Sequence, residues 1–283
     1  MKVILLLAVV LSNTVQNICA KQYKGGVFTF NLVTVLMALG IFALGSEELL
    51  LQRTILWYAL LFAITYSAAV IFITLALQCG PLSLSSLIYS YTLIIPALYG
   101  ILFLHEPLQF TTIGGLILLV VSLTLSHSHQ KAGTNYNLTP ISAKWGVYIT
   151  LAFVGNGICS TVLKVQQIAL NGMYQNEFMV LSLILISVML AVCSLVFERK
   201  KFLHSLRNGW YLGIIRGLAN GIGNTFVLIL NGMVAVSIMY PIISAGGVIA
   251  SAIIAIVIYK EKLNGTHYAG IILGVGSIVL LNL

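Results

Sequence analysis

The sequence contains no aspartate, and its six acidic residues are all glutamates. Charged residues of both signs make up only 7% of the 283 residues, whereas an average soluble domain has about 25%. A soluble fold is therefore excluded, because a chain of this length would need far more charge on its surface. The 60% of apolar residues and the mean hydropathy of +1.07 indicate a chain that lies largely in lipid.

Combinations of residues that carry enzyme chemistry are also missing. No metalloprotease motif, phosphate-binding loop or nucleophile elbow occurs, and the pair His127 and His129 is typical of a solvated loop. The four cysteines stand alone in apolar segments, without the spacing of metal ligands; they are Cys19, Cys79, Cys159 and Cys193. We therefore predict no enzymatic activity, no metal site and no cofactor.

What the chain has in abundance is long apolar runs. A helix needs about 20 apolar residues to cross a bilayer, whereas a barrel strand has about ten of alternating polarity. Ten continuous runs of helical length follow one another, at Val3–Ala20, Gly26–Gly45, Thr54–Gln78, Leu82–Leu104, Leu108–Ser126, Trp145–Leu163, Phe178–Phe197, Gly209–Asn231, Val234–Tyr259 and Tyr268–Leu283. The sequence predicts an all-α membrane protein with ten transmembrane helices.

The first run also has features of a secretory signal peptide, with Lys2 before the apolar stretch and small residues near Ala20. A counterpart in the second half of the chain favours a retained helix. The formal charge of +8 lies mostly between the runs, where Lys and Arg set membrane topology. It predicts contact with the lipid bilayer and no nucleic-acid partner.

Two longer polar stretches interrupt the runs, at residues 127–144 and 198–208. The first divides the chain into five helices (1–126), a polar linker (127–144) and five further helices (145–283). Because five is odd, the second set enters the membrane from the opposite side. Inverted repeats of this kind are found in many secondary transporters.

Residues recur between the halves at an offset that rises slightly along the chain. Asn13, Asn17 and Lys21 correspond to Asn156, Ser160 and Lys164, and Trp57 corresponds to Trp210. Further along the chain, Ser83, Ser86 and Ser90 correspond to Ser237, Tyr240 and Ser244, and Glu106, Gly115 and Ser122 correspond to Glu261, Gly270 and Ser277. The ordered set predicts a duplication.

The asparagine and terminal lysine of the first and sixth helices, Asn13 with Lys21 and Asn156 with Lys164, belong to a wider pattern. Acidic turns at 104–108 and 259–263 close the fourth and ninth helices, and a glycine-bearing helix follows each turn. Over essentially the whole chain, this pattern resembles the drug/metabolite transporter superfamily and its EamA-type ten-helix branch. The resemblance implies alternating access around a cavity lined mainly by the first, third, fourth, sixth, eighth and ninth helices.

Arg216 is a charged residue inside the eighth apolar run, with Asn220 and Asn224 on the same helical face. A charge within the membrane is costly and usually faces a partner or a water-filled cavity. The arginine is therefore a candidate cavity residue, although snorkelling to the interface is the alternative. We assign all three residues to a predicted substrate site.

The polar stripes of the first and sixth helices supply further candidates. Asn13 and Asn17 lie on one helix, and Asn156, Ser160 and Lys164 lie on the other. The asparagines either line the cavity or form hydrogen bonds between helices. For the lysine, which lies near a helix end, snorkelling is the alternative.

The fourth and ninth helices complete the predicted site with Ser86, Tyr89 and Tyr91 on one and Tyr240 and Ser244 on the other. Tyrosine offers an aromatic face and one hydroxyl, which suits an amphipathic small molecule. Pro241 removes a backbone donor, which predicts a broken helix at the ninth run. Close packing is the alternative role for the serines.

Glycines at four-residue spacing predict close helix contacts. They occur at Gly213, Gly217 and Gly221 in the eighth run and at Gly270 and Gly274 in the tenth. The resemblance implies that the tenth helix packs against the fifth within one chain. The sequence is compatible with a monomer or a homodimer.

The two indications of orientation disagree. The resemblance implies cytoplasmic termini. Yet ten Lys and Arg residues lie in the loops opposite the N-terminus and two on its own side, once Lys164 and Arg216 are left out. The positive-inside rule therefore favours termini outside.

These features favour a secondary transporter in the plasma membrane that moves a small neutral, zwitterionic or anionic metabolite, such as an amino acid. Small multidrug relatives carry a glutamate in the first helix for cationic drugs, and this chain has Asn13 in that region. One alternative is a transporter of nucleotide sugars, sugar phosphates or lipid-linked groups. The other is a membrane scaffold that transports nothing.

Overall fold

The computed structural model describes residues 2–44, 53–103, 110–128, 142–170, 173–199, 202–231, 236–260 and 265–281. Within these ranges the chain forms helices and no strand. The helices are α1 (Lys2–Gln22), α2 (Val27–Ala43), α3 (Arg53–Cys79), α4 (Leu82–Ser90), the 3₁₀ helix η1 (Tyr91–Leu93), α5 (Ile94–Phe103), α6 (Phe110–Ser128), α7 (Ala143–Ala169), α8 (Gln175–Phe197), α9 (Phe202–Asn231), α10 (Val236–Val257) and α11 (Gly265–Leu281).

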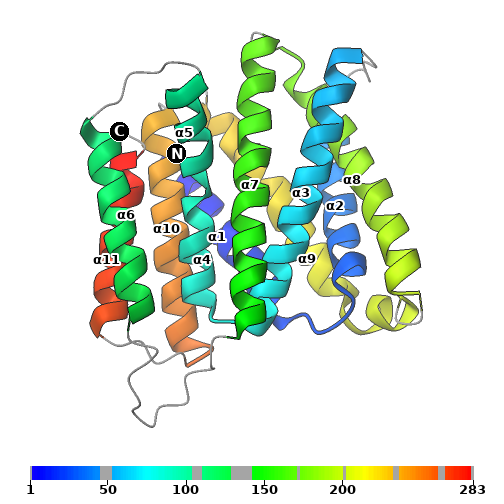
Figure 1. Cartoon of the computed structure of the whole chain (residues 1–283). Coiled ribbons are helices and arrows are strands. Elements are labelled where there is room, and N and C mark those ends of the chain that lie inside the picture. The colour runs from blue at the N-terminus through cyan, green and yellow to red at the C-terminus, as the bar shows by residue number, and fades with distance from the viewer. Residues whose placement is uncertain are drawn as a thin grey trace.

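The helices follow the predicted apolar runs, so the prediction of an all-α membrane protein is confirmed in this coarse form. Among the described residues, five stretches are long and apolar enough to cross a membrane, at Lys2–Gln22, Thr54–Cys79, Leu82–Gly100, Ala143–Ala169 and Gln175–Phe197. The count of ten membrane crossings stays a prediction. In Figure 1 the start of α1 and the end of α11 lie at the same end of the bundle.

The fourth apolar run is divided into α4, η1 and α5. Pro96, the third residue of α5, cannot donate to the carbonyl of Thr92 one turn earlier, so a regular α-helix cannot continue through this point. The prediction of a break at the ninth run is wrong, because α10 continues through Pro241. Pro241 is the sixth residue of α10, so its missing N–H removes one backbone hydrogen bond, and the helix continues beyond it.

Helices from different halves of the chain pack side by side. α1 packs on α9 and α10, α7 packs on α3 and on the α4–α5 pair, and α2 and α8 pack on α9 and α3, respectively. The glycine stripe of α9 faces α2: a Cβ at Gly217 would lie 2.5 Å from the carbonyl oxygen of Thr34. The predicted packing role of this stripe is therefore confirmed.

The predicted contact between the fifth and tenth apolar runs is also confirmed, because α6 and α11 lie together at one edge of the bundle (Figure 1). Two hydrogen bonds of 2.7 Å join them. The hydroxyl of Ser122 on α6 donates to the carbonyl of Gly270 on α11, and that of Ser277 on α11 donates to the carbonyl of Gly115 on α6. Each helix therefore supplies one donor and one acceptor.

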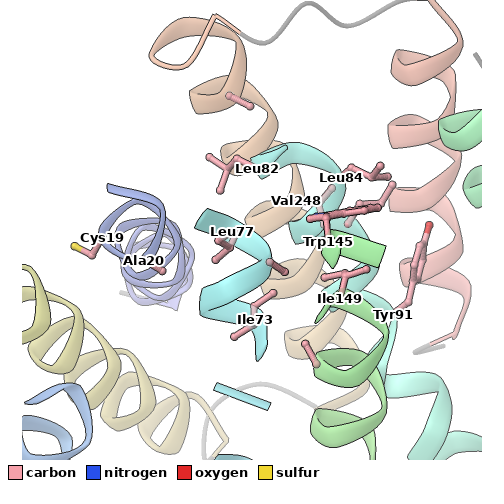
Figure 2. Close-up of a cluster of buried hydrophobic side chains, with 14 of the residues drawn as sticks. Cys19, Ala20, Ile73, Leu77, Leu82, Leu84, Tyr91, Trp145, Ile149 and Val248 are labelled. Atoms are coloured by element: carbon pink, nitrogen blue, oxygen red, sulfur yellow. The ribbon is translucent and has the colours of Figure 1, made fainter. Parts of the chain in front are cut away.

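The two ends of the bundle differ in their apolar packing. We call the end with the start of α1 and the end of α11 the terminal end, and the opposite end, with Tyr23, Gly80 and Trp145, the distal end. One continuous cluster, most of it toward the distal end, draws side chains from α1, α2, α3, α4, α7, α9 and α10 (Figure 2). At the terminal end, one cluster joins α2, α3, α7 and α8, and a separate one joins α1, α9 and α10.

Polar contacts reinforce the distal end. The Nζ of Lys21 donates to the carbonyl of Gly80 at 3.0 Å and lies 4.7 Å from the centre of the Tyr259 ring. The indole Nε1 of Trp145 donates to the hydroxyl of Ser85 at 2.9 Å. These contacts tie α1, α7 and α10 to the connection between α3 and α4.

Glu198 adds a further polar contact, at the end of α8. Its carboxylate accepts the backbone N–H groups of Phe28 and Thr29 at 3.1 and 2.9 Å and the Thr29 hydroxyl at 2.8 Å. An anion that accepts N–H groups at a helix N-terminus stabilises the helix, here α2. The end of α8 is thereby fixed to the start of α2.

Candidate functional site

A cavity of about 440 Å³ lies among α1, α2, α3, α4, α7, α8, α9 and α10. Ile73 and Leu77, which belong to the continuous cluster, line it on one side. The other two clusters each contribute to its lining, with Phe62 from one and Ile243 from the other. The cavity therefore lies between the two terminal-end clusters and is bounded by the cluster that reaches the distal end.

Most of the predicted substrate-site residues come together in the lining of this cavity, although they are spread over both halves of the chain. They are Asn13, Asn17, Ser86, Tyr89, Asn156, Ser160, Arg216, Asn220, Asn224 and Ser244. On each of α1, α4, α7, α9 and α10, the residues that the helical spacing grouped in the sequence lie on the face that lines the cavity.

Arg216 is 7% exposed and is held by neutral groups. Its Nη1 donates to Asn31 Oδ1 at 2.8 Å and to Thr74 Oγ1 at 3.0 Å, and its guanidinium lies 5.2 Å from the centre of the Phe30 ring. Its Nε is buried and has no hydrogen-bond partner among the described residues. This burial argues against the snorkelling alternative.

A chain of amides runs from α9 to α1 along the cavity wall. Asn224 donates to Asn220 at 3.2 Å, Asn220 donates to Gln16 at 2.9 Å, and Gln16 donates to Asn13 at 3.4 Å. Each carbonyl in the chain accepts from the next amide. The row offers neutral donors and acceptors in the middle of the bundle.

Asn17 and Asn156 each reach across to another helix. Asn17 donates to the hydroxyls of Ser86 on α4 and Ser251 on α10, at 3.3 and 3.4 Å. Asn156 donates to Thr92 Oγ1 in η1 at 2.7 Å. Both expected roles therefore apply at once, because these asparagines line the cavity and also join helices.

Three predicted residues do not contribute to the described lining. Tyr91 is 1% exposed and donates to Ser122 at 2.9 Å, so its hydroxyl serves the contact of η1 with α6. The prediction of Tyr91 at the cavity is wrong, because it lies two residues after Tyr89, about 200° around the helix, and therefore faces the other side. Lys164 lies on α7 outside the lining. The side chain of Tyr240 lies outside the described residues.

The sequence reasoning missed the contribution of α2. Asn31 and Thr34 line the cavity, and Asn31 is the partner of Arg216. The implied set of lining helices left out the second apolar run. The signal was present, because an asparagine within an apolar run was the feature that identified Asn13. Tyr66 on α3 was also missed.

The charge of the lining is one-sided. Arg216 is its single Lys or Arg side chain, and the described lining contains no glutamate or histidine. Among the described residues, no group of three or more His, Cys, Asp or Glu side chains is placed to hold a metal ion. The arrangement offers one cation, several neutral amides and hydroxyls, and aromatic walls.

No family model matches the sequence, and no curated protein matches it. Its fold has matches among solved structures, with 27 matching chains. One crystal structure has a TM-score of 0.63 at 12% identity, and the match covers 99% of this chain and 96% of that one. At this identity the likeness shows the fold alone.

Proposed function

We propose that this chain is a secondary transporter of the plasma membrane, which moves a small metabolite by alternating access. The observation that carries the proposal is the polar cavity, because its lining comes from both halves of the chain. Polar side chains within a membrane bundle are costly unless they bind one another, water or a substrate. A cavity of about 440 Å³ falls within the range of small-molecule sites.

Ten membrane crossings in two inverted repeats are part of the proposal. Exchanging each helix for its mate in the other half (α1 for α7, α2 for α8, α3 for α9, the α4–α5 pair for α10, α6 for α11) maps the most extensive helix contacts onto one another: α1 with α9 onto α7 with α3, and α2 with α9 onto α8 with α3. The hydrogen bonds between α6 and α11 obey the same exchange. Ser122 corresponds to Ser277, and Gly115 corresponds to Gly270. The exchange therefore turns the hydrogen bond from Ser122 to Gly270 into the one from Ser277 to Gly115.

The mechanism follows from the difference between the two ends of the bundle. In the proposed cycle this conformation is the one with access from the terminal end, where two apolar clusters flank the cavity, and transport requires that it close there and open at the distal end. Rocking of α3, α4, α9 and α10 around the cavity achieves this exchange. Lys164 corresponds to Lys21 in the other half. In the opposite state Lys164 makes contacts between helices at the terminal end like those that Lys21 makes at the distal end.

The substrate is a neutral, zwitterionic or anionic metabolite, such as an amino acid or a related compound. A lone arginine among neutral groups disfavours an organic cation, because two like charges repel strongly at low dielectric constant. Arg216 also bears on the alternative of a phosphate-bearing substrate. A phosphate dianion would meet only one cation in the described lining, which favours the smaller metabolite.

Orientation is proposed from charge. Lys21, Lys24, Lys144, Arg199 and Lys260 lie at or near helix ends on the distal side. By the positive-inside rule, the distal end then faces the cytoplasm and the termini lie outside. In Lys24→Cys, the new thiol should be protected from a membrane-impermeant reagent in intact cells. Labelling of this thiol would contradict the orientation.

Reconstitution tests the transport proposal. Purified protein in liposomes, offered a pool of labelled amino acids, organic acids, amines and nucleotide sugars, is expected to accumulate at least one compound saturably. Asn220→Leu removes the central amide of the row and should lower this flux. Gln167→Leu, which changes an exposed amide on the same half, should not. Flux no greater than in empty liposomes for every compound would overturn the proposal and favour a scaffold.

A further inference from the structure

Arg216 is held in place by one of its nitrogens and leaves another without a partner. Both of its hydrogen bonds to described residues leave from Nη1, toward Asn31 and Thr74. The Nε is buried and unpaired, in a residue that lines the cavity. Buried donors without partners are rare in folded proteins. The Nη1 group therefore has a structural function, and the Nε group has no hydrogen bond to a described residue.

The edge formed by Nε and Nη2 has the shape to bind an anion, and because Nε has no accessible surface in this conformation, binding requires the arginine side chain to shift toward the ligand. A guanidinium presents parallel N–H groups that match the two oxygens of a carboxylate, and such charge-assisted pairs are the strong hydrogen bonds of proteins. The charge of Arg216 has no acidic side chain opposite it among the described lining residues. A single negative charge brought by a ligand would make the cavity electrically neutral.

A zwitterion fits this lining less well. Its carboxylate would pair with the guanidinium, but its ammonium group would then have no acidic partner in the described lining. Leaving a desolvated charge unpaired is expensive. The cavity would also keep a net positive charge, because the two charges of the ligand cancel each other.

The rest of the cavity suits an apolar body. Phe62, Tyr66 and Tyr89 contribute rings to the lining, together with the aliphatic side chain of Val70. The amide row from Asn224 to Gln16 supplies neutral hydrogen bonds for further polar atoms of the ligand. One end of the ligand is thus charged and the remainder is amphipathic.

We infer that the substrate is a monoanionic organic acid, without an ammonium group, whose carboxylate pairs with the Nε edge of Arg216. This inference rests on the proposed transport function and narrows its substrate class. It assigns to Arg216 a direct contact with the ligand, in addition to its structural hydrogen bonds to α2 and α3.

The test compares ligands of the same shape and different charge. Binding of 3-phenylpropionate, 3-phenylpropionamide and phenylalanine to the full-length protein in detergent is measured by isothermal titration calorimetry. The acid is expected to bind about tenfold or more tightly than the amide, because a hydrogen bond to a charged group is the stronger. It should also bind more tightly than phenylalanine. Equal affinities for the acid and the amide, or for the acid and phenylalanine, would overturn the inference.

Variants then assign the preference to the arginine. In Arg216→Gln the acid and amide should bind with similar affinities, whereas Arg216→Lys should keep part of the preference, because it keeps the charge and loses the planar edge. Lys144→Gln removes an exposed lysine at the distal end and should behave as the wild type. A full preference in folded Arg216→Gln would place the anion elsewhere. If that variant does not fold, the wild-type comparison still decides.

The two proposals fail in different ways. If the wild type binds the acid selectively but liposomes containing it move none of the three compounds, the anion site stands and transport is contradicted. If liposomes transport phenylalanine or the amide as well as the acid, transport stands and the substrate class is contradicted.

Discussion

The distal and terminal ends of the bundle contain the same helices but hold them differently. At the distal end one continuous apolar cluster joins helices from both halves of the chain, and Lys21 and Trp145 add hydrogen bonds there. At the terminal end two clusters face each other across the cavity. Most of these helices run from one end to the other, so the two ends differ in which helix faces pack together, and the polar cavity lies where that packing is divided.

Trp145 makes the largest expected contribution to this difference. It is 4% exposed within the continuous cluster, so Trp145→Ala should lower the free energy of unfolding by about 3–5 kcal/mol. The loss comes from van der Waals contacts and the hydrogen bond to Ser85, which persist as stabilising terms in lipid. Thermal unfolding in detergent measures it. Trp57→Ala, at a 59% exposed position, is the matched control and should change little.

Reactivity of introduced cysteines tests the comparison directly, in a protein whose four native cysteines are replaced. Gly247 lines the cavity with open space at its Cβ, whereas Ser85 is 0% exposed at the distal end. Gly247→Cys should react with a hydrophilic thiol reagent about a hundredfold faster than Ser85→Cys, because the buried thiol reacts only after local opening. Similar rates would show that the distal end is as open as the terminal end.

Two glycines give opposite expectations for the same substitution. A Cβ at Gly80 would overlap the indole of Trp145, so Gly80→Ala should destabilise by about 1–3 kcal/mol. Gly40, on α2 near the terminal end, has nothing within 4 Å of its Cβ, so Gly40→Ala should stabilise by about 0.5–1 kcal/mol. The unfolding midpoints should move in opposite directions. A loss of stability in both variants would show that the terminal end is packed as tightly as the distal end.

Replacing Lys21 is expected to lower the stability only slightly. Lys21→Met removes the hydrogen bond to Gly80 and the contact with the Tyr259 ring, and it should cost about 1 kcal/mol. The labelling rate of a cysteine at Ser85 should rise several-fold in this variant, because the distal end opens more often. Lys24→Met, at an exposed lysine of the same end, is the control. An unchanged labelling rate would show that Lys21 does not help to keep the distal end closed.

Much of the fold followed from the sequence because lipid imposes a simple rule. A run of apolar residues long enough to cross the bilayer must be helical, so the limits of α1, α7 and α8 fell near the predicted ones. The broken fourth run was harder to predict, because Pro96 and Pro241 look alike in a sequence. The structure separates them, because a 3₁₀ turn precedes Pro96 whereas α10 is regular on both sides of Pro241.

The cavity lining was predictable wherever polar residues repeat at helical spacing. Asn220 and Asn224 show this, because a shared face must point to a shared neighbour. The same rule excludes Tyr91, which lies about 200° around the helix from Tyr89 and faces Ser122 instead of the cavity. Asn31 shares a helical face with Thr34, and this polar signal in the second run could have been used, but the pairing with Arg216 is seen only in the fold.

The paired bonds between α6 and α11 have a consequence for the origin of the chain. Ser122 and Gly115 lie in the first half, and they are a donor and an acceptor of the same kind as Ser277 and Gly270 in the second. Each half therefore contains both the serine donor and the glycine carbonyl acceptor. Under the proposed inverted repeat, two separate copies of one five-helix unit, inserted in opposite senses, would be joined by the same pair of hydrogen bonds without any covalent link between them.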